Sequence, residues 1–204
     1  MSAIQSYRAV VIGGSAGGVE ALTAILSRLE RDFELPVLVV QHLHASDDGA
    51  FWRHLARVTT LSVVEPCDKE CIQSGCVYAA PANYHMLVER LGTISLSVDA
   101  RVNWSRPSID VLFESAAVVW TEALVAIILS GANADGAQGI CAVKAAGGLT
   151  IAQRPESAPS PTMPQAAIDT GAVDEVLPAD QIGPLLGGIN GRQAARKAIG
   201  GTRE

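Results

Sequence analysis

Three residues of this chain, Ser15, His42 and Asp135, are of the types that together carry out nucleophilic hydrolysis. A serine hydroxyl is a weak nucleophile at neutral pH, so an imidazole must take its proton and a carboxylate must orient that imidazole. Ser15 stands in the glycine-rich turn GGSAGG of residues 13–18, between an apolar run and a helical pattern. Glycines around a serine let the backbone bend sharply and expose the hydroxyl near free helix N–H groups. This turn predicts a nucleophile, provided that the fold brings His42 and Asp135 to it.

The same strand–glycine–helix pattern is also compatible with a phosphate-binding turn. A dinucleotide fingerprint needs glycine where the turn approaches the pyrophosphate, and Ser15 occupies that position here. The acidic residue expected near the end of the second strand is absent, and His42 stands there instead. These two departures favour the nucleophile over the phosphate cradle.

Each of the three residues also has a purely structural interpretation. Ser15 could be a turn or helix-cap residue, and His42 could hydrogen-bond to backbone at a strand end. Asp135 precedes Gly136 at the start of a predicted helix, where an aspartate commonly acts as the N-cap. The chain order Ser, His, Asp differs from that of an ordinary α/β-hydrolase, but such sets are recognised by geometry and not by order.

A metallohydrolase is a further alternative, because His42 and His44 are followed by aspartates at 47 and 48. The remaining ligands would have to come from His85 or Asp135, and no second cluster follows. Four cysteines are present without C-x-x-C spacing, and we expect them to be reduced thiols (Cys67, Cys71, Cys76 and Cys141). We therefore expect neither a metal nor a cofactor.

The composition is that of a globular protein with an aliphatic core. Hydrophobic residues make up 49% of the 204 residues but aromatic residues only 4%, and the net charge is −6. The absence of a basic stripe disfavours nucleic-acid binding, and the longest apolar runs are too short to insert into a membrane. No signal-peptide pattern precedes the first strand, so we expect a cytoplasmic protein.

Apolar runs of strand length alternate with helical patterns along most of the chain, which predicts a doubly wound α/β fold. We expect a mostly parallel sheet, helices on both of its faces and an antiparallel edge hairpin. Parallel strands are predicted at 9–13, 36–41, 62–65, 125–130, 149–152 and 173–177, and helices at 18–29, 48–57, 108–120, 135–146, 164–170 and 179–187. The shorter segments 75–80, 85–90 and 93–98 are predicted to form an insertion at the sheet's edge, the last two as a hairpin.

We expect one domain over residues 1–204, with a core of about residues 8–187 and a polar C-terminal tail at 188–204. In a doubly wound sheet, ligands bind at the carboxyl ends of the strands. Ser15, His42 and Asp135 each stand at or just past such an end. The predicted fold would therefore bring all three to one rim.

These segments resemble the catalytic domain of the chemotaxis protein-glutamate methylesterase family, CheB. The resemblance rests on GGSAGG at 13–18, VQH at 40–42 and LSG-x-x-x-DGA at 129–137. Further agreement lies in VYAAP at 77–81, RPSIDVLF at 106–113, Met163-Pro164 and VDEVLP at 173–178. Together these motifs cover about residues 8–185 in order, which is far more specific than any one of them.

The resemblance implies a serine esterase that hydrolyses glutamate γ-methyl esters on the cytoplasmic helices of chemoreceptors and releases methanol. By matching position, Ser15 is implied as the nucleophile, His42 as general base and acid, and Asp135 as the orienting carboxylate. Backbone N–H groups at Ala16 and Ala132 are implied as the oxyanion hole. The same machinery would suit the side-chain amide of glutamine.

Many members of this family carry an N-terminal receiver domain that gates the esterase, whereas the first predicted strand here begins at Ala9. We therefore expect constitutive activity or regulation by a signalling partner in trans. A non-catalytic CheB-like signalling or scaffold module is the alternative. The complete Ser-His-Asp set counts against that alternative, while the acidic residues after His42 count for it.

Overall fold

A seven-stranded parallel sheet forms the centre of the molecule. The computed structural model describes residues 6–44 and 46–200, with side chains described as far as residue 189. The strands are β1 (Ala9–Gly14), β2 (Val37–Gln41), β3 (Ser62–Val64), β4 (Cys76–Ala79), β7 (Leu124–Ile128), β8 (Leu149–Gln153) and β9 (Glu175–Leu177). They pair in the order β3-β4-β2-β1-β7-β8-β9, with every pair parallel.

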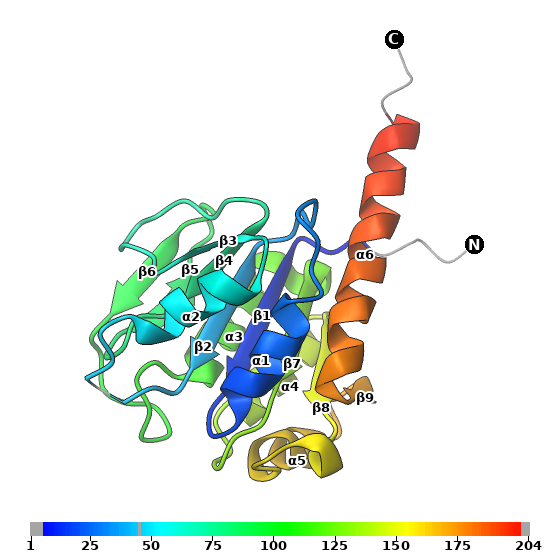
Figure 1. Ribbon diagram of the computed structural model, residues 1–204. Helices are drawn as coiled ribbons and strands as arrows, with labels where there is room; N and C mark the ends of the chain where they lie inside the picture. Colours follow the sequence, from blue (N-terminus) through cyan, green and yellow to red (C-terminus); the bar gives the residue numbers. More distant parts are fainter. Residues whose placement is uncertain (1–5, 45, 201–204) are drawn as a thin grey trace.

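Helices cover both faces of this sheet (Figure 1). One face carries α1 (Gly18–Leu26), α2 (Ala50–Val58) and α6 (Ala179–Gly200). The other carries α3 (Ile109–Trp120), α4 (Ala137–Ala145) and α5 (Thr162–Asp169), together with the antiparallel pair β5 (His85–Val88) and β6 (Ile94–Ser97). Two short 3₁₀ turns, at Thr121–Ala123 and Pro155–Ser157, complete the connections.

The central strands are apolar throughout because both of their faces are covered. In β1, Val10 and Ile12 belong to the apolar layer under α1 and α6, while Val11 belongs to the layer under α3. Such continuous burial is typical of parallel sheets that carry helices on both sides. The predicted fold class is confirmed, and the two layers share one sheet, which supports our proposal of a single domain.

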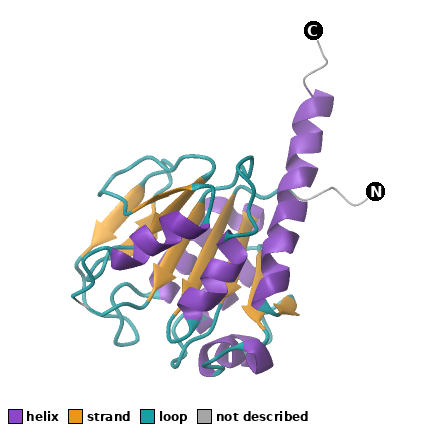
Figure 2. Cartoon of the chain, viewed as in Figure 1, coloured by secondary structure: helices purple, strands orange, loops and turns teal. Residues whose placement is uncertain are grey.

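The prediction for residues 75–80 was wrong. We expected them at the sheet's edge, but β4 lies inside the sheet between β2 and β3 (Figure 2). All four residues of β4 are buried, as an interior parallel strand requires. Only β5 and β6 form the antiparallel pair, as a separate two-stranded sheet packed against α3. The strand is so short that its sequence does not distinguish an interior position from an edge position.

Helix α6 is longer than predicted. We expected it to end at Gly187, but it continues to Gly200, although two consecutive glycines disfavour a helix. The segment after the glycines contains glutamine, alanine, arginine and lysine, which are strong helix formers. In Figure 1 this C-terminal part extends away from the rest of the molecule. The predicted polar tail is thus helical up to residue 200, and residues 201–204 lie outside the described part.

Gly136 should be intolerant of a side chain, which gives a test of the packing between α3 and β7. Its φ is +97°, and a Cβ there would overlap Ile128 Cδ1 and lie 2.7 Å from Ile109 Cγ2. We expect Gly136→Ala to lower the free energy of unfolding by about 2–4 kcal/mol, since backbone strain and overpacking add. Gly171→Ala is the control, because φ is +72° there but no atom lies within 4 Å. If denaturant unfolding showed equal losses of stability in the two variants, packing against Ile109 and Ile128 would not be the cause of the loss in Gly136→Ala.

Candidate active site

The three candidate residues lie at the carboxyl ends of neighbouring strands. Ser15 follows β1, His42 follows β2, and Asp135 lies in the loop after β7. Strands β2 and β7 flank β1 on opposite sides, so the chain runs in opposite directions across the sheet from this point. Ligands of doubly wound sheets bind at such a switch point, because the loops on either side diverge and leave a crevice.

His42 and Asp135 form a direct pair. His42 Nε2 lies 2.8 Å from Asp135 Oδ2, and the side chains are 13% and 0% exposed, respectively. An ionised carboxylate can only accept hydrogen bonds, so the imidazole donates from Nε2. In the neutral ring Nδ1 then carries the free lone pair and can accept a proton. The predicted proximity of these two residues is therefore observed, with Nδ1 left as the basic nitrogen.

The Asp135 carboxylate accepts hydrogen bonds from five donors. They are His42 Nε2, Asn103 Nδ2, Ser108 Oγ and the backbone N–H groups of Ile109 and Asp110, at 2.8 to 3.3 Å. The two backbone N–H groups belong to the first turn of α3, and the N-terminus of a helix favours negative charge. Burial would raise the pKa of Asp135, but the hydrogen bonds, with that from His42 foremost, outweigh it and hold the pKa below its ordinary value.

The interpretation of Asp135 as the N-cap of its own helix was wrong. Helix α4 begins at Ala137, and its N-cap is Gly136, without a side-chain cap. Asp135 instead binds the N-terminus of α3, and Ile109 there lies 26 positions earlier in the chain. Sequence patterns describe a residue's neighbours along the chain, so they assigned this aspartate to the nearer helix.

Ser15 is held by its backbone and makes no hydrogen bond with its hydroxyl among the residues described. Its N–H donates to the Ser130 carbonyl at 2.9 Å, and its own carbonyl accepts from Gly18 N–H and from Gln41 Nε2. The N-cap of α1 is Gly17, so Ser15 is not the cap. His42 N–H donates to the Gly14 carbonyl at 3.0 Å, which places the turn of Ser15 beside the histidine. The hydroxyl is therefore available to a ligand.

Ala16 and Ala132 lie in the loops that follow β1 and β7, at the same rim. Both residues are exposed, and within the described ranges neither N–H donates to another protein group. The buried Ser130 hydroxyl joins their two loops: it donates to the Ala16 carbonyl at 2.7 Å and accepts from Ser160 N–H at 2.9 Å. Two unpaired N–H groups on joined loops could bind a developing oxyanion.

Sequence reasoning missed the buried polar residues that hold these loops. Gln41 donates to the Ser15 carbonyl at 2.7 Å, and Gln153 Oε1 accepts from Ser130 N–H at 2.9 Å. All three side chains are almost fully buried at the ends of apolar strands. The sequence did contain a signal for them, because each is a single polar residue at the end of an apolar run. A polar group buried there has to be hydrogen-bonded, so it indicates a contact with a neighbouring loop.

The loop before α3 contributes two further residues that the sequence did not indicate, Asn103 and Ser105. Ser105 Oγ lies 3.5 Å from His42 Nδ1. Asn103 Nδ2 donates to Asp135 Oδ1 at 3.0 Å and to Asp110 Oδ2 at 2.7 Å, so one amide bridges two carboxyl groups. Burial, more than the nearby charge of Asp135, raises the pKa of Asp110. No strand or helix pattern places this loop, which explains why the sequence did not reveal it.

The histidines of the metallohydrolase alternative have other partners. His44 Nδ1 is 2.7 Å from Ser46 Oγ. His85 is buried, and its ring bonds to the Ala100 carbonyl and to Ser108 N–H. Over residues 6–44 and 46–189, no three histidine, cysteine or acidic side chains are grouped closely enough to hold a metal ion. Within the described chain, no helix combines the length and apolar character needed to cross a membrane.

Comparisons with known proteins agree with the geometry. The sequence profile described as CheB methylesterase matches residues 10–186. A Leptospira interrogans protein, provisionally named protein-glutamate methylesterase/protein-glutamine glutaminase, is 47% identical over 181 residues, which cover 89% of this chain and 94% of that protein. A Symbiobacterium thermophilum protein of the same name, without that reservation, is 40% identical over 88% of this chain but over only 49% of its own length. This chain thus spans about half of that longer relative.

A solved structure gives the same answer for the fold. The crystal structure of the Thermotoga maritima CheB methylesterase catalytic domain superimposes with a TM-score of 0.85 at 34% identity. The alignment covers 89% of this chain and 97% of that domain. With its sequence profile, its relatives and its fold in agreement, the chain belongs to the CheB methylesterase family.

Proposed function

We propose that this protein is a serine esterase that hydrolyses glutamate γ-methyl esters on chemoreceptor signalling helices, in the cytoplasm. The observation that carries the proposal is the hydrogen-bonded pair of His42 and the buried Asp135, beside the turn of Ser15. The names of the relatives supply the substrate class, since several are called protein-glutamate methylesterase/protein-glutamine glutaminase. Methylated receptor helices are thus the proposed partners.

In the proposed acylation step, Ser15 Oγ attacks the ester carbonyl while His42 Nδ1 takes the hydroxyl proton. The carbonyl oxygen becomes an oxyanion, which the N–H groups of Ala16 and Ala132 stabilise. Asp135 keeps the imidazole oriented and stabilises the imidazolium by accepting from Nε2. The intermediate collapses when the imidazolium proton passes to the departing methoxy group, so methanol leaves and Ser15 is acylated.

Deacylation repeats the same proton movements with water. His42 Nδ1 removes a proton from the water that attacks the glutamyl ester of Ser15, and returns it to Ser15 Oγ as that bond breaks. The product is a free γ-carboxylate. A glutamine side chain would follow the same course with ammonia as the leaving group, and the second half of the relatives' names supports this activity. Ammonia release from receptor glutamines, measured beside methanol release, tests it.

Covalent labelling tests whether Ser15 is activated. We expect a fluorophosphonate to modify the folded protein once, at Ser15, and to leave the unfolded chain unmodified, because an unactivated serine does not react. A folded protein that resists labelling and releases no methanol would instead support the non-catalytic module. Loss of activity with a chelator would support the metal alternative.

A further inference from the structure

A pocket of about 300 Å³ opens beside His42 and is not used by the proposed reaction. Residues of three loops surround it, among them His42, Arg101, Trp104, Ser105 and Arg106. The lining contains two arginines and no aspartate or glutamate, although the protein carries a net charge of −6. We call it the Arg101 pocket. Its charge differs in sign from that of the protein as a whole, which indicates an anionic occupant.

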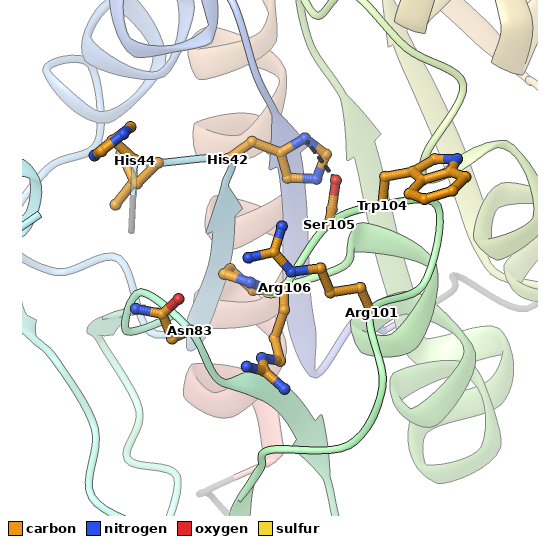
Figure 3. Close-up of a pocket in the computed structure, with 9 residues that line it drawn as sticks. His42, His44, Asn83, Arg101, Trp104, Ser105 and Arg106 are labelled. Carbon is orange, nitrogen blue, oxygen red and sulfur yellow. Dashed lines mark hydrogen bonds between the residues drawn. The ribbon is translucent and has the colours of Figure 1, made fainter. Parts of the chain in front are cut away.

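Arg101 supplies the charge that faces into the pocket. Figure 3 shows its side chain extending across the pocket toward Ser105 and His42. It is exposed, and within the described ranges it forms neither a hydrogen bond nor an ion pair. A guanidinium presents a planar fork of donors that matches a carboxylate in two parallel hydrogen bonds. Arg101 is therefore a cation without a counter-ion, placed next to the imidazole.

Arg106 is held in place and adds to the positive field. In Figure 3 it runs away from His42, and its Nη1 donates to the carbonyls of Val98 and Asp99. Carbonyl oxygens carry no net charge, so the guanidinium is not neutralised there. Its Nε is buried without a hydrogen-bond partner in the part of the chain described. Two arginines without a carboxylate partner thus belong to one pocket.

A strained turn fixes this pocket relative to the proposed catalytic residues. Val102 and Ser105 exchange backbone hydrogen bonds, and the two residues between them, Asn103 and Trp104, have φ of +49° and +64°. A left-handed tryptophan is uncommon and unfavourable, and such strain concentrates at functional sites. Asn103 ties the turn to Asp135, while the Trp104 side chain is 93% exposed. The turn therefore presents Arg101 and Trp104 at a constant position beside His42.

The acidic residues after His42 do not neutralise Arg101. Asp48 pairs with Arg53 at 2.9 Å, and Asp47 Oδ1 accepts from Gly49 N–H at 2.8 Å. Both carboxylates are engaged by neighbours, Asp48 by a residue of α2 and Asp47 by its own loop, and neither lines the pocket. In the sequence these aspartates counted for the non-catalytic alternative. In the structure they have partners close by in the chain and add no negative charge to the lining of the pocket.

We propose that the Arg101 pocket takes a carboxylate side chain of the substrate segment, near the glutamyl ester that Ser15 attacks. This inference rests on the proposed function and adds a substrate preference to it. Esters with an acidic residue nearby in the substrate are preferred to esters with a neutral residue there. Arg101 pairs with that carboxylate, and the exposed Trp104 ring packs against the same segment. Arg101 would then determine specificity and take no part in bond breaking.

Equilibrium binding and turnover of matched peptides test the proposal. The probes are helical peptides with one glutamate γ-methyl ester and, three or four residues to either side, glutamate or glutamine. We expect the wild type to show a kcat/KM about tenfold higher for the best glutamate peptide than for its glutamine counterpart. Arg101→Gln should remove the preference, Arg101→Glu should reverse it, and high salt should reduce it. Arg90→Gln, in the turn at the far end of the β5–β6 hairpin, removes the same charge and should keep the preference.

A second readout separates this inference from the proposed function. Binding of the same peptides to Ser15→Ala, followed by fluorescence anisotropy, needs no turnover and should show the same preference for glutamate. Binding with that preference but without wild-type methanol release would support the pocket and contradict the esterase. Equal affinity and equal kcat/KM for the two peptides would overturn the pocket, as would a preference that survives in Arg101→Gln. Hydrolysis of a small neutral methyl ester should be the same in Arg90→Gln and the wild type.

Discussion

Ser15→Ala is expected to release no methanol from methylated receptor above about one thousandth of the wild-type rate, while its fold remains intact. Loss of the hydroxyl removes the nucleophile, and the backbone N–H groups of the turn can then only polarise the ester. The fold should be preserved because the Ser15 hydroxyl has no hydrogen-bond partner in the described structure, and its backbone contacts need no side chain. The free energy of unfolding should change by no more than about 0.5 kcal/mol. Methanol release and denaturant unfolding measure the two effects.

Ser105→Ala is the matched control for this variant. Ser105 is the other serine beside the imidazole, with Oγ at 3.5 Å from His42 Nδ1. We expect its loss to lower kcat by less than about tenfold, because this hydroxyl only touches the base. The opposite pattern, an active Ser15→Ala and an inactive Ser105→Ala, would make Ser105 the nucleophile and overturn our assignment. Fluorophosphonate labelling of both variants would confirm which hydroxyl reacts.

Asp135→Asn is expected to have the largest combined effect on activity and stability. Without a carboxylate, the imidazole loses its orienting acceptor, and kcat should fall by about 10³- to 10⁴-fold, as for other such aspartates. The new amide group would face donors, because the wild-type oxygens accept five hydrogen bonds and are buried. We expect the free energy of unfolding to fall by about 2–4 kcal/mol at neutral pH. Methanol release and denaturant unfolding check both parts.

The stability lost in Asp135→Asn should depend on pH in a definite direction. The pKa of Asp135 is held below its ordinary value in the folded protein. Its ionised form therefore contributes stability above the unfolded-state pKa, near 4, and this contribution is lost as pH falls through the lower, folded-state pKa. The stability difference between wild type and Asp135→Asn should consequently shrink below about pH 4. A difference that grows in acid would contradict an ionised, hydrogen-bonded Asp135.

Asp174→Asn provides the control for Asp135. Asp174 also has a lowered pKa, because the effect of burial is outweighed by hydrogen bonds from Lys144 and Thr150. It lies before β9, away from the rim of Ser15, so we expect some loss of stability but at least half of the wild-type activity. Comparable losses of kcat in the two variants would mean that activity follows stability alone, and that Asp135 has no special role.

Much of the fold could be predicted because its local patterns follow from burial. Apolar runs such as 37–40 are buried on both faces, and their alternation with helical segments predicts a parallel sheet. That prediction also placed Ser15, His42 and Asp135 at one rim, because parallel strands all end on the same side. The prediction for β4 was wrong, since its four residues do not reveal which strands they pair with.

The sequence by itself determined the class of fold and the three residues proposed for chemistry, because these depend on residue types and on periodicity along the chain. The family followed from a resemblance of several motifs in the same order. Only the tertiary structure decided how the three residues are arranged and supported. His42 meets Asp135 across 93 positions of sequence, and Ser130 joins the loop of Ala16 across 114. The loop that carries Arg101, Asn103 and Ser105 has no periodic pattern, and its place is set by contacts with distant elements. Such contacts form only when the sheet and α3 pack together, so no local pattern records them.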